Sequence, residues 1–211
     1  MQQRTAQHFF DNAIRSQHAW RFKAARLHRA GISILRRAAA AKEGAESFCS
    51  ERAQFAAEED DVFEEFMEFE VGLLLLALCV ENLLKGLWCG KNHAAINSVT
   101  NQRHLAALAD PTSKLTTHNL GEIARATGVD LSASEFDALD ALEGIIMWEG
   151  RYPTPLTVTD YHKYFQHGGP ISKFFAGPSI FTIPLPVPPV IEAIIEKINE
   201  ELNLIPDSAR F

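Results

Sequence analysis

The feature that most constrains this chain is a long helical repeat of apolar residues near its centre. The apolar positions alternate steps of four and three, which places them along one face of an α-helix. Further apolar residues fill the other faces of its second half, so we expect protein to surround that part on all sides. The sequence therefore predicts a buried central helix that ends at Gly90, with a repeat formed by Val62, Phe66, Phe69, Leu73, Leu76, Val80, Leu83 and Leu87.

Helical patterns also flank this central element. No proline occurs from Thr5 to Ala41, and apolar residues recur there at helical spacing, which predicts a long first helix. Gly31 and Ser33 are expected to bend or divide this helix, and Gly44 to end it.

Two shorter helices carry start and stop signals. Asn119 and Ser132 each precede a helical pattern, and a glutamate follows each of them three residues later, which is the signature of a capping box. Gly128 and Gly150 are expected to end these two helices.

The composition changes after Pro153. A stretch rich in proline and glycine blocks helix formation, and a last helix is expected over residues 190–202. Large apolar residues within the stretch favour packing on the bundle over a disordered linker. We therefore predict an all-α fold: an antiparallel up-and-down bundle of four to five helices over residues 1–155, followed over residues 156–211 by an extended wrap and a terminal helix.

Cysteine usage and hydropathy indicate a soluble cytoplasmic protein. Cys49, Cys79 and Cys89 fit neither an even disulfide framework nor a Cys-x-x-Cys metal site, so we expect free thiols in a reducing compartment. The N-terminus lacks a secretory signal, and no segment approaches the ~20 apolar residues of a membrane-spanning helix. Motifs for metals and cofactors are absent from the sequence, so we expect neither, and we expect no membrane contact.

The net charge of −7 is unevenly distributed. Residues 1–43 carry +7, so the remainder carries −14, and residues 51–70 alone contribute nine carboxylates. Such asymmetry indicates either a contact with nucleic acid or a pairing of the basic helix with the acidic one. We favour the pairing, within one chain or between subunits, because the chain supplies both partners.

Three short segments place polar groups in or beside apolar helices, where such groups are unfavourable unless partnered. Glu81 and Lys85 are four residues apart on the central helix, which suits an ion pair. Arg151 follows a helix end, where it either binds the last carbonyls of that helix or holds a phosphate or carboxylate. We predict that six residues line one binding site: Glu81, Lys85, His118, Trp148, Arg151 and Tyr152.

The same segments resemble the HEPN family of small helical bundles. The resemblance covers about residues 60–155 and rests on Glu81-Asn82-Leu83-Leu84-Lys85, His118-Asn119-Leu120 and Trp148-Glu149-Gly150-Arg151-Tyr152-Pro153. It implies an antiparallel bundle, frequent homodimers and, in many members, metal-independent RNA cleavage by an arginine and a histidine with four to six residues between them. Other members are nucleotide-binding or interaction modules.

The catalytic spacing of that family is not reproduced around Arg151, because the next histidine, His162, lies too far along the chain. Only Arg21 and His28 meet the spacing, with six residues between them, and both belong to the first helix. They are therefore the candidate catalytic pair if the protein cleaves RNA.

Three functions fit these observations. The leading hypothesis is a homodimeric HEPN-like binding or interaction module of bacterial type, in a stress, defence or toxin-antitoxin setting, with RNA or a nucleotide as ligand. The second is a ribonuclease that uses Arg21 and His28, with the basic first helix binding phosphates. The third is a structural scaffold whose polar residues only secure helix ends.

Overall fold

Helices form every regular element that the structure describes. The computed structural model describes residues 17–51, 59–97, 114–115, 117–149 and 188–205, and these ranges contain no strand. This confirms the predicted all-α bundle. The helical elements are α2 (Gln17–Glu51), α3 (Glu59–Lys91), α4 (His93–Asn97), α6 (Leu120–Thr127), α7 (Ala133–Gly144), the π-helical turn η1 (Ile145–Glu149) and α9 (Pro189–Leu204).

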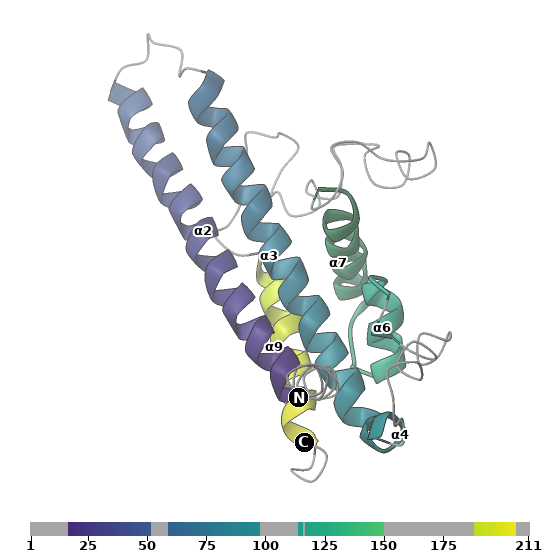
Figure 1. Cartoon of the computed structure of the whole chain (residues 1–211). Helices are drawn as coiled ribbons and strands as arrows, with labels where there is room; N and C mark the ends of the chain where they lie inside the picture. The colour runs from purple at the N-terminus through teal and green to yellow at the C-terminus, as the bar shows by residue number, and fades with distance from the viewer. Residues whose placement is uncertain (1–16, 52–58, 98–113, 116, 150–187, 206–211) are drawn as a thin grey trace, which may run out of the picture.

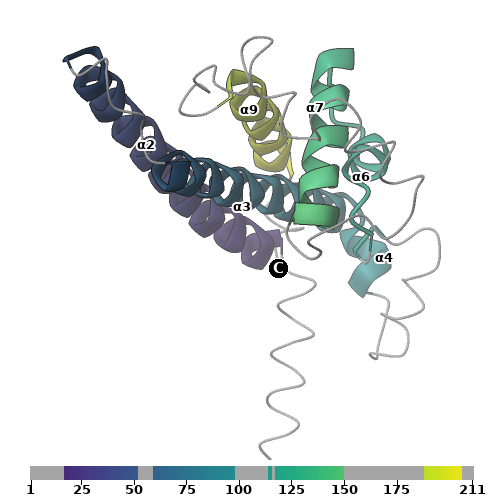
Figure 2. The same cartoon turned by 90° about the horizontal axis from the view of Figure 1, so that it is seen from above.

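The two longest helices, α2 and α3, form an antiparallel pair (Figure 1). Helices α6, α7 and α9 lie around the C-terminal half of α3 (Figure 2). The backbones of α2 and α3 meet at two glycines. A Cβ atom on Gly31 would lie 3.0 Å from the carbonyl oxygen of Gly72, and one on Gly72 would lie 2.6 Å from Leu35 Cδ2. Only residues without a side chain fit at this crossing.

The course of α2 corrects two expectations. The helix is continuous from Gln17 to Glu51, so Gly31 and Ser33 do not divide it and Gly44 does not end it. Glycine inside a helix costs about 1 kcal/mol relative to alanine, which is too little to end a long helix that packs along its length. The expected part of this helix before Gln17 lies outside the described residues.

The apolar repeat of α3 forms the core of the bundle, as predicted. Contrary to the expectation that no segment approaches a membrane-spanning helix, Glu68–Lys91 is long and apolar enough to cross a membrane by length and composition. However, 78% of its apolar window is buried inside the protein, as in a core helix. The side chains of Val62 and Phe66 are not among those described. The buried members of the repeat are Phe69, Leu73, Leu76, Val80, Leu83 and Leu87.

Helix α6 begins and ends where the sequence predicts. Asn119 Oδ1 accepts a hydrogen bond from the backbone N–H of Glu122 at 2.8 Å, and Gly128 closes the helix in the left-handed conformation with φ 69°. One detail differs from the capping-box expectation. The Glu122 side chain pairs with Lys114 instead of returning to Asn119, whose N–H donates to Thr117 Oγ1 at 3.0 Å.

Helix α7 begins at the complete capping box that the sequence predicts. The Ser132 hydroxyl accepts from the Glu135 N–H, and Glu135 Oε2 accepts from the Ser132 N–H at 2.6 Å. Lys197 of α9 donates to the same carboxylate oxygen at 2.7 Å, so this cap also joins α7 to α9. Burial opposes ionisation of Glu135, but the bonds from Lys197 and Ser132 outweigh it and hold the pKa below its usual value.

Helix α9 is the expected terminal helix. Pro189 occupies its first turn, where proline is favoured because no intrahelical N–H is needed there. Gln17 Nε2 donates to the carbonyl of Leu202 at 3.3 Å, which ties the start of α2 to the end of α9. The expected extended wrap, up to residue 187, lies outside the described residues. Each side chain on the buried face adds roughly 1.5–3 kcal/mol of hydrophobic stabilisation; that face consists of Ile191, Ile194, Ile195, Ile198 and Leu202.

Candidate binding site on α3

Glu81 and Lys85 form a buried ion pair on α3. Lys85 Nζ donates to Glu81 Oε1 at 2.5 Å, and the two side chains are only 5% and 7% exposed, respectively. The structure thus contains the pair that the spacing of four residues predicts. A buried charge is very unfavourable without a partner, so each of these two residues depends on the other.

His118 brings a second element to this pair. It precedes α6, and its Nδ1 lies 3.1 Å from Glu81 Oε1. An ionised carboxylate only accepts hydrogen bonds, so Nδ1 carries the hydrogen in this contact. The ring is 28% exposed and is therefore the most accessible member of the group. Glu81, Lys85 and His118 together are called the α3 polar cluster below.

Two buried oxygens beside these contacts remain without hydrogen bonds. Glu81 Oε2 and Asn82 Oδ1 have no partner among the described residues. The amide group of Asn82 is otherwise used, since its Nδ2 donates to the carbonyl of Leu78 at 2.5 Å. An unpaired buried acceptor costs about 1–3 kcal/mol, and more when it is charged. Both oxygens therefore favour a partner that carries N–H or O–H donors.

A residue that the sequence analysis missed fixes the start of α6. Glu143 Oε2 accepts a hydrogen bond from the backbone N–H of Leu120 at 3.1 Å. This satisfies one of the N–H groups that a helix start leaves free, and a carboxylate is favoured there by the helix dipole. The available signal was a charged residue among the apolar positions of α7. Its bond holds α6 on α7 two residues beyond His118.

The side chains of the other three predicted binding residues are outside the part of the chain that the structure describes. Trp148 belongs to η1, but its side chain is not described, and Arg151 and Tyr152 lie outside the described residues. A π-helical turn is rare and occurs often at functional sites, and no sequence pattern indicated it here. The convergence of Trp148, Arg151 and Tyr152 with the α3 polar cluster remains a prediction.

Arg21 and His28, the candidate catalytic pair, line one cavity between α2, α3 and α9. The cavity measures about 220 Å³. Arg21 Nη2 donates to Asn203 Oδ1 of α9 at 3.1 Å. The two residues that match the family spacing therefore share a site in space. Its other lining residues are Ala24, Ala25, Cys79, Leu83, Ile195 and Asn199.

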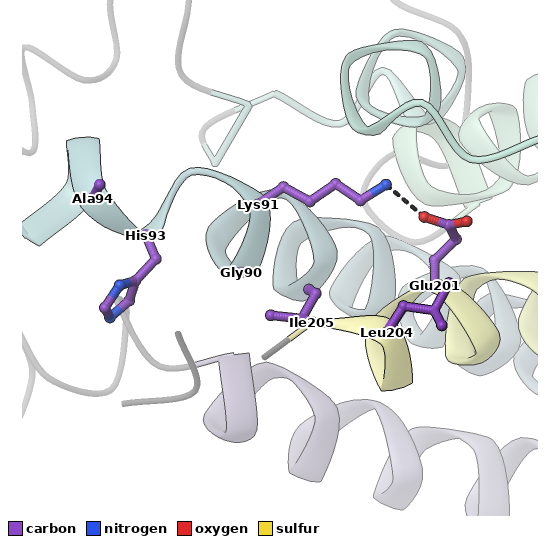
Figure 3. Close-up of a pocket in the computed structure, with 7 residues that line it drawn as sticks. All are labelled: Gly90, Lys91, His93, Ala94, Glu201, Leu204 and Ile205. Carbon is purple, nitrogen blue, oxygen red and sulfur yellow. Dashed lines mark hydrogen bonds and ion pairs between the residues drawn. The ribbon is translucent and has the colours of Figure 1, made fainter. Parts of the chain in front are cut away.

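A more open pocket of about 460 Å³ lies where α3 and α9 end (Figure 3). Lys91 Nζ donates to Glu201 Oε2 at 2.5 Å and to the carbonyl of Thr127 at 2.8 Å. This ammonium meets the C-terminal ends of three helices, where the helix dipoles favour positive charge. These contacts give Lys91 a structural role. Lys91 is also the last residue of α3, which therefore ends one residue beyond Gly90, the predicted stop.

The described cysteines are not positioned for chemistry. Burial raises the pKa of Cys79 and of Cys89 to about 12, so both thiols stay protonated and pack as small apolar side chains. Within the ranges that the structure describes, no group of three or more His, Cys, Asp or Glu side chains could hold a metal ion.

Comparison with known proteins adds no family assignment. No family model matches this chain, and neither the curated proteins nor the solved structures contain a match. Functional inference therefore depends on the sequence motifs and on the geometry given above.

Proposed function

We propose that this chain is a HEPN-like binding module of bacterial type, in which the α3 polar cluster holds RNA or a nucleotide. The module is a cytoplasmic homodimer in this proposal, and it serves a stress, defence or toxin-antitoxin response. One observation carries the proposal. Glu81 Oε1 receives both Lys85 and His118, while the buried Oε2 is left without a partner among the described residues.

The chemistry of the cluster suits the donors of a nucleotide. Ribose hydroxyls and the N–H groups of nucleobases can donate to Glu81 Oε2 and to Asn82 Oδ1. The ammonium of Lys85 balances the carboxylate charge, and His118 lies at the accessible side. Two of the three segments that carry the HEPN resemblance meet at this point, which supports the assignment.

Isothermal titration of the full chain with ribonucleoside monophosphates and triphosphates tests the proposal. His118→Ala is expected to lower the affinity at least tenfold, the loss of about 1.4 kcal/mol, and to leave folding intact because the Glu81–Lys85 pair remains. His93→Ala is the matched control, since His93 is a partly exposed histidine on α4 and outside the cluster.

Two results contradict the proposal. Either the protein binds none of these nucleotides, or the two histidine variants bind them equally well. In both cases the cluster only secures α3 to the start of α6, and the scaffold interpretation replaces the binding module.

A ribonuclease is the second candidate, because Arg21 and His28 line the same cavity. In this alternative His28 moves a proton and Arg21 stabilises the charge that develops on the phosphate. Incubation with a structured RNA, with and without a chelator, is expected to show cleavage that needs no metal. Absence of cleavage, or cleavage that survives His28→Ala, removes this candidate.

A further inference from the structure

The exposed side of α2 between residues 17 and 39 carries cations and no carboxylates. Residues 17–39 contain six Lys or Arg and no Asp or Glu, in a chain whose net charge is −7. None of the exposed cations in this segment forms an ion pair with a described carboxylate. The exposed cations are Lys23, Arg26, Arg29, Arg36 and Arg37.

An aromatic ring lies within this row of cations. Phe22 is 65% exposed, and the steps from Phe22 to Arg26 and Arg29 are four and three residues, so the three side chains share one side of the helix. From His18 to Arg37 the surface extends ~28 Å at 1.5 Å per residue. We call it the outer face of α2; it consists of His18, Phe22, Arg26, Arg29, Arg36 and Arg37.

Charges on the neighbouring helix limit this surface to one side. The end of α9 meets the start of α2 through the bonds of Gln17 to Leu202 and of Arg21 to Asn203, and α9 exposes Glu192, Glu196 and Glu200. These carboxylates repel an anion that approaches over α9. An anionic ligand is therefore directed to the side of α2 turned away from α9.

The outer face exposes little apolar surface, and this distinguishes between the kinds of anionic partner that it could bind. Phe22, Val71 and Leu204 are the exposed large hydrophobic residues in the described ranges, and only Phe22 belongs to this face. One ring is too little for an amphipathic membrane helix, and too little for the apolar centre of a protein interface. Cations with a single exposed ring suit a single nucleic-acid strand, whose phosphates bind arginine and whose bases stack on aromatic side chains.

We propose that the outer face of α2 binds single-stranded nucleic acid. Arg26, Arg29 and Arg36 contact successive phosphates, and Phe22 stacks on one base. Binding is insensitive to sequence, because every base has a flat face. The inference is independent of the α3 polar cluster, which lies on another helix and holds buried rather than exposed charges.

Fluorescence anisotropy of the full chain with a fluorescein-labelled 20-nucleotide oligouridylate, between 50 and 300 mM KCl, tests this proposal. The double variant Arg26→Gln/Arg29→Gln is expected to reduce the slope of log K against log salt by about 1.4, since each phosphate contact on a single strand contributes about 0.7. Phe22→Ala is expected to lower the affinity roughly tenfold and to keep the slope.

Matched controls separate the outer face from overall charge and from the α3 polar cluster. Arg125→Gln removes one exposed arginine on α6 and is expected to leave binding unchanged. His93→Ala, on α4 and outside both the outer face and the α3 polar cluster, is also expected to leave oligouridylate binding unchanged. The titration with mononucleotides tests the cluster separately, so failure here and failure of nucleotide binding at the cluster are distinguishable. Thermal unfolding followed by circular dichroism verifies that each variant is folded.

Four results overturn the proposal. The first is an unchanged salt slope in the double arginine variant, and the second is an equal loss of affinity in Arg125→Gln. The third is equal binding of a 20-base-pair duplex together with no effect of Phe22→Ala. The fourth is binding to phosphatidylglycerol vesicles without binding to oligouridylate. A fifth is a molar mass from light scattering that falls by half in the double variant, which would assign the face to a second copy of the chain.

Discussion

The charges of the α3 polar cluster and those of the outer face of α2 differ in what surrounds them. Lys85 lies inside the protein and holds its charge only beside Glu81. Arg26 and Arg29 lie in water, which solvates them without a partner. The difference teaches that a change in the buried Glu81–Lys85 pair acts on folding first, whereas a change on the outer face acts on binding alone.

Removal of the buried ammonium is expected to have the largest effect. Lys85→Met leaves the Glu81 carboxylate buried with only His118 as a partner, so the free energy of unfolding should fall by about 3–5 kcal/mol. Urea denaturation measures this loss. The double variant Glu81→Met/Lys85→Met should regain most of it, because no uncompensated charge remains. A single-variant loss below about 1 kcal/mol would break the comparison, since it would mean that water reaches the pair.

A pH titration of stability extends the comparison to Glu135, a carboxylate outside both regions. Glu135 has a folded-state pKa below its usual 4.5, because Lys197 and Ser132 bind the ionised form. Its contribution is therefore complete above the pKa of the unfolded state and is lost as the pH falls through the folded-state pKa. Urea midpoints measured from pH 7 down to pH 3 should fall less in Glu135→Gln than in the wild type. Equal slopes would contradict the assignment.

Lys91 provides an intermediate case, because its side chain is 34% exposed. Lys91→Met removes the bonds to Glu201 and to the carbonyl of Thr127, but the Glu201 side chain is 31% exposed, so water can still solvate its carboxylate. We expect a loss of about 1 kcal/mol in the free energy of unfolding. A loss as large as that of Lys85→Met would show that partial exposure does not weaken such a contact.

The smallest effect is expected on the outer face. Arg26→Gln and Arg29→Gln should each change the free energy of unfolding by less than about 0.5 kcal/mol, since both side chains are exposed and neither forms an ion pair with a described carboxylate. The same urea experiment measures it. A larger loss in either variant would show that these cations support the fold.

Local signals in the sequence predicted much of the fold. The apolar repeat of α3, the caps at Asn119 and Ser132, the stop at Gly128 and the ion pair of Glu81 with Lys85 all depend on residues within one or two helical turns of each other. Such short-range geometry is fixed by the helix itself, so spacing is sufficient to read it.

Features that depend on tertiary packing were harder to predict. Gly31 has the propensity of a helix breaker, yet α2 continues through it, and it lies close to Gly72 of α3. Glu143 gives no local sign that it binds the start of α6. The meeting of His118 with Glu81 was expected from the need to pair buried polar groups, but its distance follows only from how α6 packs on α3.

The Gly31–Gly72 crossing has a consequence for how the molecule presents its cations. Sliding α3 along α2 by one turn would bring Leu76 or Glu68 to the position of Gly72, where Leu35 leaves no room. Rolling α2 about its own axis would replace Gly31 by a bulkier neighbour. Gly31 and Gly72 therefore favour one register and one rotation of α2 against α3. That arrangement determines the side of the molecule to which the arginines of the outer face point.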